Sequence, residues 1–480
     1  MNHLKKLSIE HYKWFFEEQS CEFWIPDWQG NWSGLTVITW PNNTGKTSII
    51  EALLIQIREE GLGVPFGKEF KFSSAERHPW SNPKISIEYL NNELAQDSVV
   101  YTNISNWSQV RKQDKTKSHN ILFEVIQSRR FWQAKTSNTY DERTFFGSTR
   151  YALPRNSSWV DTAAILKTIN NDPTKKGIFN SLLKNIVNIT WWTIDTDDDN
   201  QDFIVYTTWS WISHQAWLLW DWIISIFRIC AQLINHDNTA VIIDEPELSL
   251  HPQAQKRLAK VLSEKAKDRQ IIVCTHSPYF VNWDDFLNWA QFIRLNKYND
   301  QKCTISQLNW DTNYSSLIGT LCYERQKPQL LDIAAKEIMF SENILFVEWQ
   351  EDVWLIKKYI NEENITLNFD IFWYWVWWYS NIKPFLEMSK DLWLEKVWVL
   401  YDNWLGTTID NEELPNMYIN YLFKKLSTND IRDKYDKDEN LIKEWIFDKH
   451  WVIKTNKKNE FKQIIHDFID YFNELWTNLQ

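Results

Sequence analysis

The stretch GLTVITWPNNTGKTSIIEALL, residues 34–54, joins an apolar strand to a helix through a polar turn. Residues 35–39 form a short apolar run typical of a buried strand, and apolar side chains recur at helical spacing over residues 48–60. The turn between them fits the phosphate-binding template G-x-x-x-x-G-K-[ST] at every fixed position except the first, where Trp40 replaces glycine. This succession predicts an α/β fold built around a phosphate-binding loop.

The tryptophan at position 40 is one of 31 in a chain of 480 residues that has only 10 glycines. Glycine averages roughly 7% of residues in soluble proteins, so this chain is depleted in it. Tryptophan also clusters where glycine is expected, as in FWYWVWWYSNIKPF (372–385) and VLYDNWLG (399–406). Our hypothesis is that many tryptophans are misread glycines, from a gene in which the codon UGA means glycine and was translated as tryptophan.

At position 40 the hypothesis has a steric argument, because a β-carbon and an indole would crowd a tight turn that glycine permits. The alternative is a chain that is truly rich in tryptophan. UGG codons at positions 40, 211 and 375 would support the alternative and contradict the hypothesis.

The net charge of −11 argues against a surface that attracts nucleic acid as a whole. Contact with DNA is then expected at local basic segments such as RKQDKTK (111–117) and QSRRFWQAK (127–135), although such runs are more often a solvated face. No apolar run reaches membrane-spanning length and no signal-peptide pattern opens the chain, so we predict a soluble, cytoplasmic protein that contacts no membrane. The cysteines have no paired spacing, which predicts reduced structural thiols without a disulfide framework or a zinc site: Cys21, Cys230, Cys274, Cys303 and Cys322.

Strands alternate with helices along the chain, which is typical of α/β domains with a buried, largely parallel sheet. The first domain is expected over residues 1–335, with a helical insertion at about 100–200. The second, smaller α/β domain is expected over 336–480, with a C-terminal helical extension. The pattern predicts strands within 1–50, near 85–90 and at 240–244, 270–276, 343–348, 369–375 and 396–402, and helices at 157–190, 213–235, 252–268, 351–361, 380–392 and 458–478.

Three separated motifs have the chemistry of a nucleotide site. In the turn after the first strand, main-chain N–H groups are expected to cradle phosphate, Lys46 to reach the β- and γ-phosphates, and the Thr47 hydroxyl to hold Mg²⁺. VIIDEPELSLHP (241–252) ends a strand with Asp244, which would position Mg²⁺ through water, and Glu245, which would polarise the attacking water. IIVCTHSP (271–278) contains His276, placed to sense the γ-phosphate. An Asp-Glu pair after an apolar strand is often only a strand end, but the three motifs in this order predict an ATPase.

These motifs resemble the ABC-type ATPase heads of SMC, RecF-like and OLD-family proteins. The resemblance implies that TTWSWISHQAWLLWDW (207–222), read with glycine for tryptophan, is the signature motif, and that ELSLHP (247–252) is the D-loop. It also implies that Ser210 and residue 211 cap the ATP held by a second subunit, and hence a homodimer or higher oligomer formed through the heads. The alternative for 207–222 is an amphipathic core helix. The residues expected to bind ATP and Mg²⁺ are Asn42, Asn43, Thr44, Gly45, Lys46, Thr47, Ser48, Ser210 and Asp244.

In the second domain, ENILFVEWQEDVWLIKKYI (342–360) resembles the opening of a TOPRIM domain when glycine replaces tryptophan. The resemblance implies that Glu348, Asp352 and Asp402 hold Mg²⁺ or Mn²⁺ beside a phosphodiester, with Glu348 and Asp402 catalytic. One departure is Trp404, which stands where the family has the second Asp of Asp-x-Asp. Two alternatives are that Glu348 and Asp352 only cap a helix, and that the domain is a degenerate TOPRIM fold that does not cut. Carboxylates that would complete the site are Glu351, Glu412, Glu413, Asp436 and Glu439, among which nothing in the sequence selects.

An ABC-type ATPase followed by a TOPRIM domain resembles the architecture of OLD-family nucleases. The resemblance implies ATP hydrolysis coupled to metal-dependent DNA cleavage in defence against phage, with a separate defence partner as one option. One rival function is an ATPase that senses or scaffolds and uses its TOPRIM-like domain only for binding. A second rival is a DNA-repair or chromosome-organising head, which is disfavoured because residues 85–200 show no sustained heptad.

Overall fold

The structure is a computed structural model, and it describes about two thirds of the chain. The described part forms two compact units, Met1–Gln307 and Leu308–Gln480. The expected boundary between residues 335 and 336 lies at the edge of a segment outside the described residues and stays a prediction. None of the described helices combines the length and apolar character needed to cross a bilayer. The described residues are 2–12, 14–40, 48–50, 52–53, 84–91, 96–105, 109–114, 123–126, 159–196, 202–207, 213–215, 221–235, 240–282, 284–285, 288–298, 302–309, 336–366, 369–373, 382–392, 394, 396–402, 414–427, 431, 433–435, 441–443, 446–448 and 450–474.

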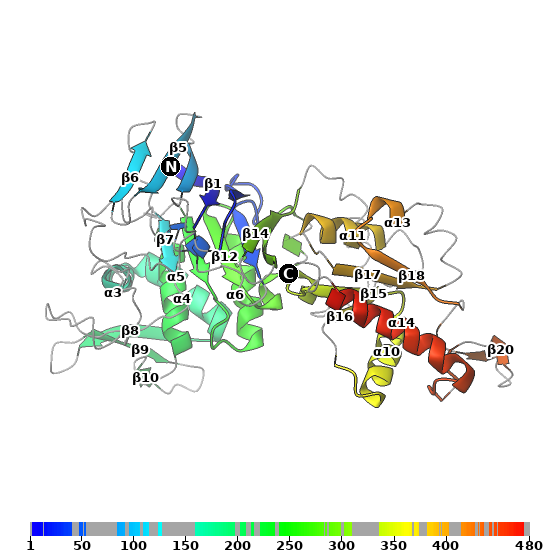
Figure 1. The fold of residues 1–480 in the computed structure, drawn as a ribbon. Helices are drawn as coiled ribbons and strands as arrows, with labels where there is room; N and C mark the ends of the chain where they lie inside the picture. Colours follow the sequence, from blue (N-terminus) through cyan, green and yellow to red (C-terminus); the bar gives the residue numbers. More distant parts are fainter. Residues whose placement is uncertain are drawn as a thin grey trace. The chain divides into compact units, whose positions relative to one another are not determined.

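The first unit is organised around a six-stranded sheet of order β14-β13-β3-β12-β11-β7 (Figure 1). All neighbouring strands are parallel except β13 and β14, which form an antiparallel pair. The three central strands are buried along their whole length, as expected for strands covered on both faces. The strands are β3 (Leu35–Thr39), β7 (Phe123–Ile126), β11 (Ala240–Asp244), β12 (Gln270–Thr275), β13 (Gln291–Tyr298) and β14 (Lys302–Gln307).

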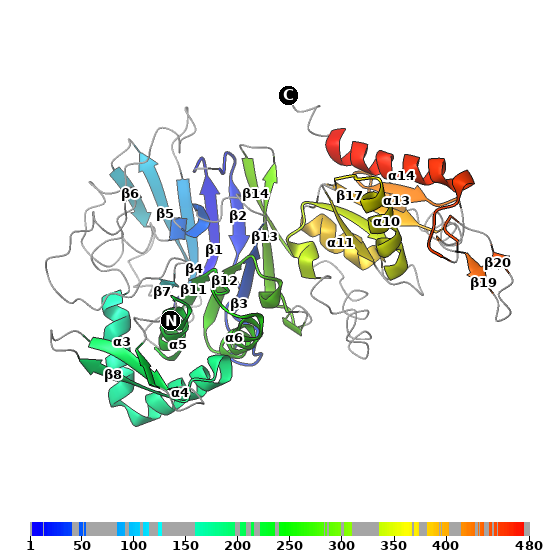
Figure 2. The same cartoon turned by 90° about the horizontal axis from the view of Figure 1, so that it is seen from below.

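A second, five-stranded antiparallel sheet of order β2-β1-β4-β5-β6 packs over one face of the central sheet (Figure 2). One hydrophobic cluster joins the two sheets and contains Leu7 and Ile87 from the antiparallel sheet and Ile38, Ile242 and Ile272 from the central one. Helices α5 (Asp221–Ile234) and α6 (Pro252–Lys265) lie on the other side of the central sheet. The added strands are β1 (Asn2–Glu10), β2 (Gln19–Glu22), β4 (Lys84–Asn91), β5 (Gln96–Ser105) and β6 (Gln109–Asp114).

The insertion expected at about 100–200 is helical only in part. Helices α3 (Trp159–Asn171) and α4 (Pro173–Val187) confirm the helical prediction for 157–190. Asp172 begins α4, because its side chain accepts hydrogen bonds from the N–H groups of Thr174 (2.9 Å) and Lys175 (3.2 Å). Strands β5, β6 and β7 occupy the described residues before α3. The mixed, polar sequence of this segment did not predict these strands. An antiparallel sheet of β8 (Trp191–Thr196), β9 (Asp202–Thr207) and β10 (Ser213–Gln215) follows α4.

The helix predicted over 213–235 is wrong at its start. Residues 213–215 pair with β9 as strand β10, and α5 begins only at Asp221. A continuous amphipathic helix across 207–222, the alternative to a signature motif, is therefore excluded. The other predicted elements that fall on described residues are present, with ends that shift by at most four residues.

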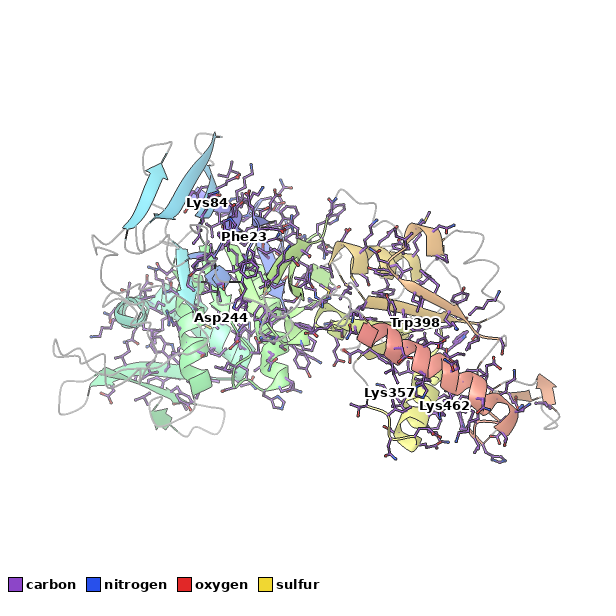
Figure 3. The ribbon with its side chains drawn as sticks, in the orientation of Figure 1. Phe23, Lys84, Asp244, Lys357, Trp398 and Lys462 are labelled. Carbon is purple, nitrogen blue, oxygen red and sulfur yellow. The ribbon has the colours of Figure 1, made fainter. Side chains whose placement is uncertain are left out.

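The second unit has a four-stranded, all-parallel sheet of order β16-β15-β17-β18. Helices α10 (Gln350–Glu362) and α14 (Thr455–Glu474) share its core on one face, where Trp398 lies against Phe468 of α14 with ring centroids 3.8 Å apart (Figure 3). On the other face, Phe385 of α11 (Ile382–Asp391) packs near Phe346. The remaining elements are β15 (Asn343–Val347), β16 (Asp370–Trp373), β17 (Lys396–Tyr401), β18 (Leu422–Lys425), β19 (Lys434–Tyr435), β20 (Leu441–Lys443), α13 (Leu414–Met417) and the 3-10 helices η3 (Pro278–Phe280) and η5 (Glu337–Met339).

Three tryptophans have the left-handed backbone conformation that favours glycine: Trp28 (φ 65°), Trp289 (φ 71°) and Trp451 (φ 63°). A bulky aromatic residue at positive φ is a strong outlier, because its β-carbon meets the following carbonyl oxygen. Trp28 and Trp289 are also more than half exposed. These positions support the hypothesis that part of the tryptophan is misread glycine.

Four cysteines fall on described residues, and all four are buried and stand outside any disulfide. Burial raises the pKa of the Cys21 thiol to about 12, and it also raises the pKa of Cys230. Cys322 lies outside the described residues.

Candidate active site

The predicted nucleotide site lies where β3, β12 and β11 end side by side. Thr39 pairs with Thr275, and Cys274 pairs with Asp244, so the three strands stop at nearly the same level. The residues that follow the strands are Trp40, His276 and Glu245. Because carboxyl ends of parallel strands are where ligands bind in open α/β sheets, this edge is the candidate site of the first unit.

At the end of β11, Asp244 is buried with 6% of its side chain exposed (Figure 3). The next residue, Glu245, donates its main-chain N–H to the carbonyl oxygen of Cys274 at 2.8 Å and has φ 47°. A non-glycine residue in the left-handed region costs roughly 1–3 kcal/mol, and such strain clusters at functional sites. Among the described non-glycine residues with a positive φ, Glu245 is the one that the sequence predicted as catalytic.

His276 at the end of β12 is held on both ring nitrogens by Trp40. Its Nδ1 lies 3.1 Å from the Trp40 carbonyl oxygen, which assigns the proton to Nδ1, and its Nε2 accepts from the Trp40 indole N–H. The two ring centroids are 4.4 Å apart, and Trp40 is only 2% exposed. Glycine at position 40 would keep the carbonyl contact and remove the indole from the Nε2 face of His276.

Glu247, which the sequence placed only within the D-loop, connects the ends of β11 and β12. Its carboxylate accepts the main-chain N–H of His276 (2.7 Å) and the hydroxyl of Thr275 (2.8 Å). Burial raises the pKa of this carboxyl above its ordinary value, while the two hydrogen bonds oppose the rise. In the sequence, the motif ELSLHP marked the segment that contains Glu247, but it did not indicate what the Glu247 side chain does.

Most of the predicted phosphate loop and the signature serine lie outside the described residues, namely Asn42, Asn43, Thr44, Gly45, Lys46, Thr47 and Ser210. Ser48 is described, is buried, and is followed by residues in helical conformation at 49–50 and 52–53. The described part of the site therefore contains Asp244, Glu245 and His276 at one edge of one sheet.

In the second unit, Glu348 and Asp402 follow the neighbouring parallel strands β15 and β17. The register pairs Phe346 with Val399, which puts both carboxylates at the same edge of the sheet. Each side chain is 1% exposed. The strand ends therefore bring two of the three predicted metal ligands to one edge.

The third predicted ligand, Asp352, caps a helix, which was the alternative to metal binding in the sequence analysis. Its carboxylate accepts the main-chain N–H of Trp349 at 2.9 Å, and its own N–H donates to the Trp349 carbonyl oxygen at 3.1 Å. This reciprocal pair caps the N-terminus of α10.

Among the described residues, no group of three or more histidine, cysteine or acidic side chains is arranged to hold a metal ion. Glu351 is half-buried in α10, whereas Trp404 and the other carboxylates considered for this site, Glu412, Glu413, Asp436 and Glu439, lie outside the described part of the chain. The described carboxylates alone do not fit a complete metal site.

Comparison with known proteins finds a family model that matches part of the first unit. Residues 223–282 match the family model described as "AAA domain, putative AbiEii toxin, Type IV TA system". The match runs from α5 through β11 and α6 to the residues just after η3, and so includes Asp244, Glu245 and His276.

Curated relatives align over short segments. The OLD nuclease of Thermus scotoductus is 34% identical over 133 residues, 27% of this chain and 24% of that protein. Endonuclease GajA of Bacillus cereus is 26% identical over 139 residues, 29% of this chain and 22% of that protein. The chain thus spans about a quarter of the length of either relative.

Solved structures with a similar chain trace include SMC heads. The SMC head domain from Thermotoga maritima aligns with TM-score 0.38 and 16% identity, over 64% of this chain and 99% of that one. The Smc head domain from Pyrococcus furiosus aligns with TM-score 0.44 and 11% identity, over 68% of this chain and 100% of that one.

The fold, the strand-end residues and the family match define a class: the chain contains an α/β, AAA-type ATPase domain. Within that class it has distant, partial similarity to the OLD nuclease and to GajA.

Proposed function

We propose that the first unit binds and hydrolyses ATP at the carboxyl edge of its central sheet, and that two copies of the unit act together. The observation that carries the proposal is the meeting of Asp244, Glu245 and His276 at the edge where β3 leads into the phosphate-binding sequence. The dimer follows from the predicted role of Ser210, which would complete the nucleotide site of a second copy.

Each predicted residue of the nucleotide site has a defined task in this proposal. The buried Asp244 carboxylate and the Thr47 hydroxyl are hard oxygen ligands of the kind Mg²⁺ prefers, and Asn42 to Ser48 with Lys46 would bind the phosphates. Bound Mg²⁺ would neutralise charge on the β- and γ-phosphates. Glu245 would orient the attacking water and accept its proton, and His276 would sense the γ-phosphate from the face that glycine at position 40 would leave open.

The rate of ATP hydrolysis by the Glu245→Gln variant tests whether Glu245 is the catalytic base. Removing the carboxylate base while keeping its shape should lower kcat by about 100-fold or more and leave ATP affinity close to wild type. The matched control is Glu264→Ala, an exposed position on α6 that should change neither quantity. Wild-type turnover in Glu245→Gln would contradict the role of this residue.

We further propose that the second unit is a DNA endonuclease that uses Mg²⁺ or Mn²⁺ under the control of ATP in anti-phage defence. Support comes from the position of Glu348 and Asp402 at one sheet edge and from the partial similarity to two proteins named as nucleases. The described carboxylates do not complete a metal site, so no cleavage step is assigned to them. The second candidate, a sensor or scaffold that binds DNA or a partner without cutting, is favoured by the same incomplete site.

Incubation of supercoiled plasmid with protein, ATP and either metal separates these two functions. Cleavage that is lost in Glu348→Gln, with ATP turnover intact, supports the endonuclease. Intact ATP turnover without cleavage in either metal supports the sensor or scaffold.

A further inference from the structure

A closed ring of hydrogen bonds joins the loop after β11 to the loop after β12. The Glu247 carboxylate receives the His276 N–H at 2.7 Å and the Thr275 hydroxyl at 2.8 Å. These two bonds span the gap between the loop that carries Glu245 and the loop that carries His276.

Helix α6 closes the ring. The Thr275 hydroxyl oxygen accepts the Ser277 N–H at 2.9 Å, and the Ser277 hydroxyl donates to the side-chain oxygen of Gln255 at 2.6 Å. The Gln255 amide group donates to the Leu250 carbonyl oxygen at 2.8 Å, and the Leu250 N–H returns to the Glu247 carbonyl oxygen at 2.9 Å. Every donor in this ring is paired with an acceptor.

The ring fixes segments that the strands alone would not. The last register pair of β11 and β12 is Asp244 with Cys274, and one further main-chain bond joins the Glu245 N–H to the Cys274 carbonyl oxygen, so Glu247 and His276 stand beyond the ladder. The Glu247 side chain extends from the loop after β11 and bonds to the loop after β12, so it holds the two loops at a set spacing. Polar networks in which every group is hydrogen-bonded make a site rigid.

We propose that Glu247 and Gln255 are positioning residues for ATP hydrolysis, which keep the Glu245 loop and the His276 loop in register so that water and γ-phosphate are aligned. Neither side chain is assigned contact with ATP. This role rests on the proposed ATPase function, since it concerns the same site.

Loss of the ring should slow ATP hydrolysis more than it weakens ATP binding. Displacement of a catalytic group by about 1 Å can lower a rate by about 100-fold, whereas the phosphates are bound mainly by the loop after β3. Breaking the ring should therefore act on kcat and leave KM for ATP nearly unchanged.

Four variants of the full chain test the proposal: Glu247→Ala, Glu247→Gln, Gln255→Ala and, as a control outside the ring on α6, Glu264→Ala. ATP turnover and amide hydrogen exchange are measured on each. Glu247→Ala should lower kcat by about tenfold to 100-fold with KM within about twofold. Glu247→Gln, which keeps an oxygen that accepts the His276 N–H, should recover most of the rate.

Hydrogen exchange reports on the ring without reference to turnover. In Glu247→Ala the His276 and Ser277 amides should exchange about three- to tenfold faster, as expected for the loss of one hydrogen bond, while the amides of residues 271–274 in β12 stay protected. A merely structural role would instead speed exchange throughout β12.

The outcomes are distinguishable. The positioning role would be overturned if Glu247→Ala had the kcat of the wild type, or if its KM changed as much as its kcat. It would also be overturned if the His276 amide exchanged equally fast in both proteins. A wild-type chain without ATP turnover would overturn the proposed ATPase and the role together, even if exchange shows that the ring forms.

Discussion

Among single residues, a left-handed backbone has a direct bearing on function at Glu245 and on the tryptophan content at three other positions. Glu245 adopts a left-handed conformation at the edge of the central sheet, where strain is consistent with a catalytic task. Trp28, Trp289 and Trp451 adopt the same conformation. For these three, a glycine in the natural protein explains the conformation without any function.

Replacing Trp289 by glycine should stabilise the first unit. The left-handed conformation penalises a β-carbon by roughly 1–2 kcal/mol, and the greater freedom of glycine in the unfolded chain offsets part of that, so we expect a gain of about 1 kcal/mol. Urea unfolding measures the change. The control is Trp191→Gly, an equally exposed tryptophan in strand β8, which should lower stability because glycine weakens strands. Equal effects at the two positions would contradict the argument.

His3 gives the first unit a pH dependence. Burial, with a smaller contribution from the N-terminal ammonium, lowers the pKa of His3 to about 4 from its ordinary value of 6.5. The unfolded chain therefore binds a proton between pH 6.5 and 4 that the folded chain does not, so stability falls as pH falls through this window. Urea unfolding of His3→Gln should show a shallower fall, by about 1.4 kcal/mol per pH unit. Identical slopes for wild type and His3→Gln would refute the assignment.

At the scale of elements, the sequence predicted those whose pattern is local. β3, β11 and β12 were predictable because each is a continuous apolar run, and α6 and α14 because their apolar side chains recur at helical spacing. β5, β6 and β10 were missed, although each pairs with a strand that neighbours it along the chain, because their mixed, largely polar sequences carry no clear strand pattern. The site followed the same rule: Asp244, Glu245 and His276 end predictable strands, whereas the role of Glu247 arises from a contact between two loops.

The start of α10 decides between two roles for Asp352. If its task is to cap the helix, Asp352→Asn should keep the acceptor for the Trp349 N–H and stay close to wild type, while Asp352→Ala should lose about 1 kcal/mol of stability. Thermal unfolding of both variants measures this. A metal ligand would behave differently: Asp352→Asn would abolish metal-dependent DNA cleavage at unchanged stability.

At the scale of the whole molecule, the chain has two units with separate hydrophobic cores. Nucleotide should therefore stabilise the first unit selectively. A ligand at 100 times its Kd adds about 2.7 kcal/mol to the state that binds it. Hydrogen exchange of the full chain with Mg²⁺ and ATP should show slower exchange in β11 and β12, and no change in β15 and β17. Protection in the second unit alone would contradict the placement of the site.

All the functions proposed for this chain require ATP to bind at the carboxyl edge of the β3, β12 and β11 strands. Calorimetric titration of ATP into the chain, expressed from a gene whose codon 40 has been read, tests it most directly. We predict saturable binding in the presence of Mg²⁺ that Lys46→Ala abolishes, because the phosphates lose their ammonium group. Absence of binding by the wild-type chain, or undiminished binding by Lys46→Ala, would contradict the claim.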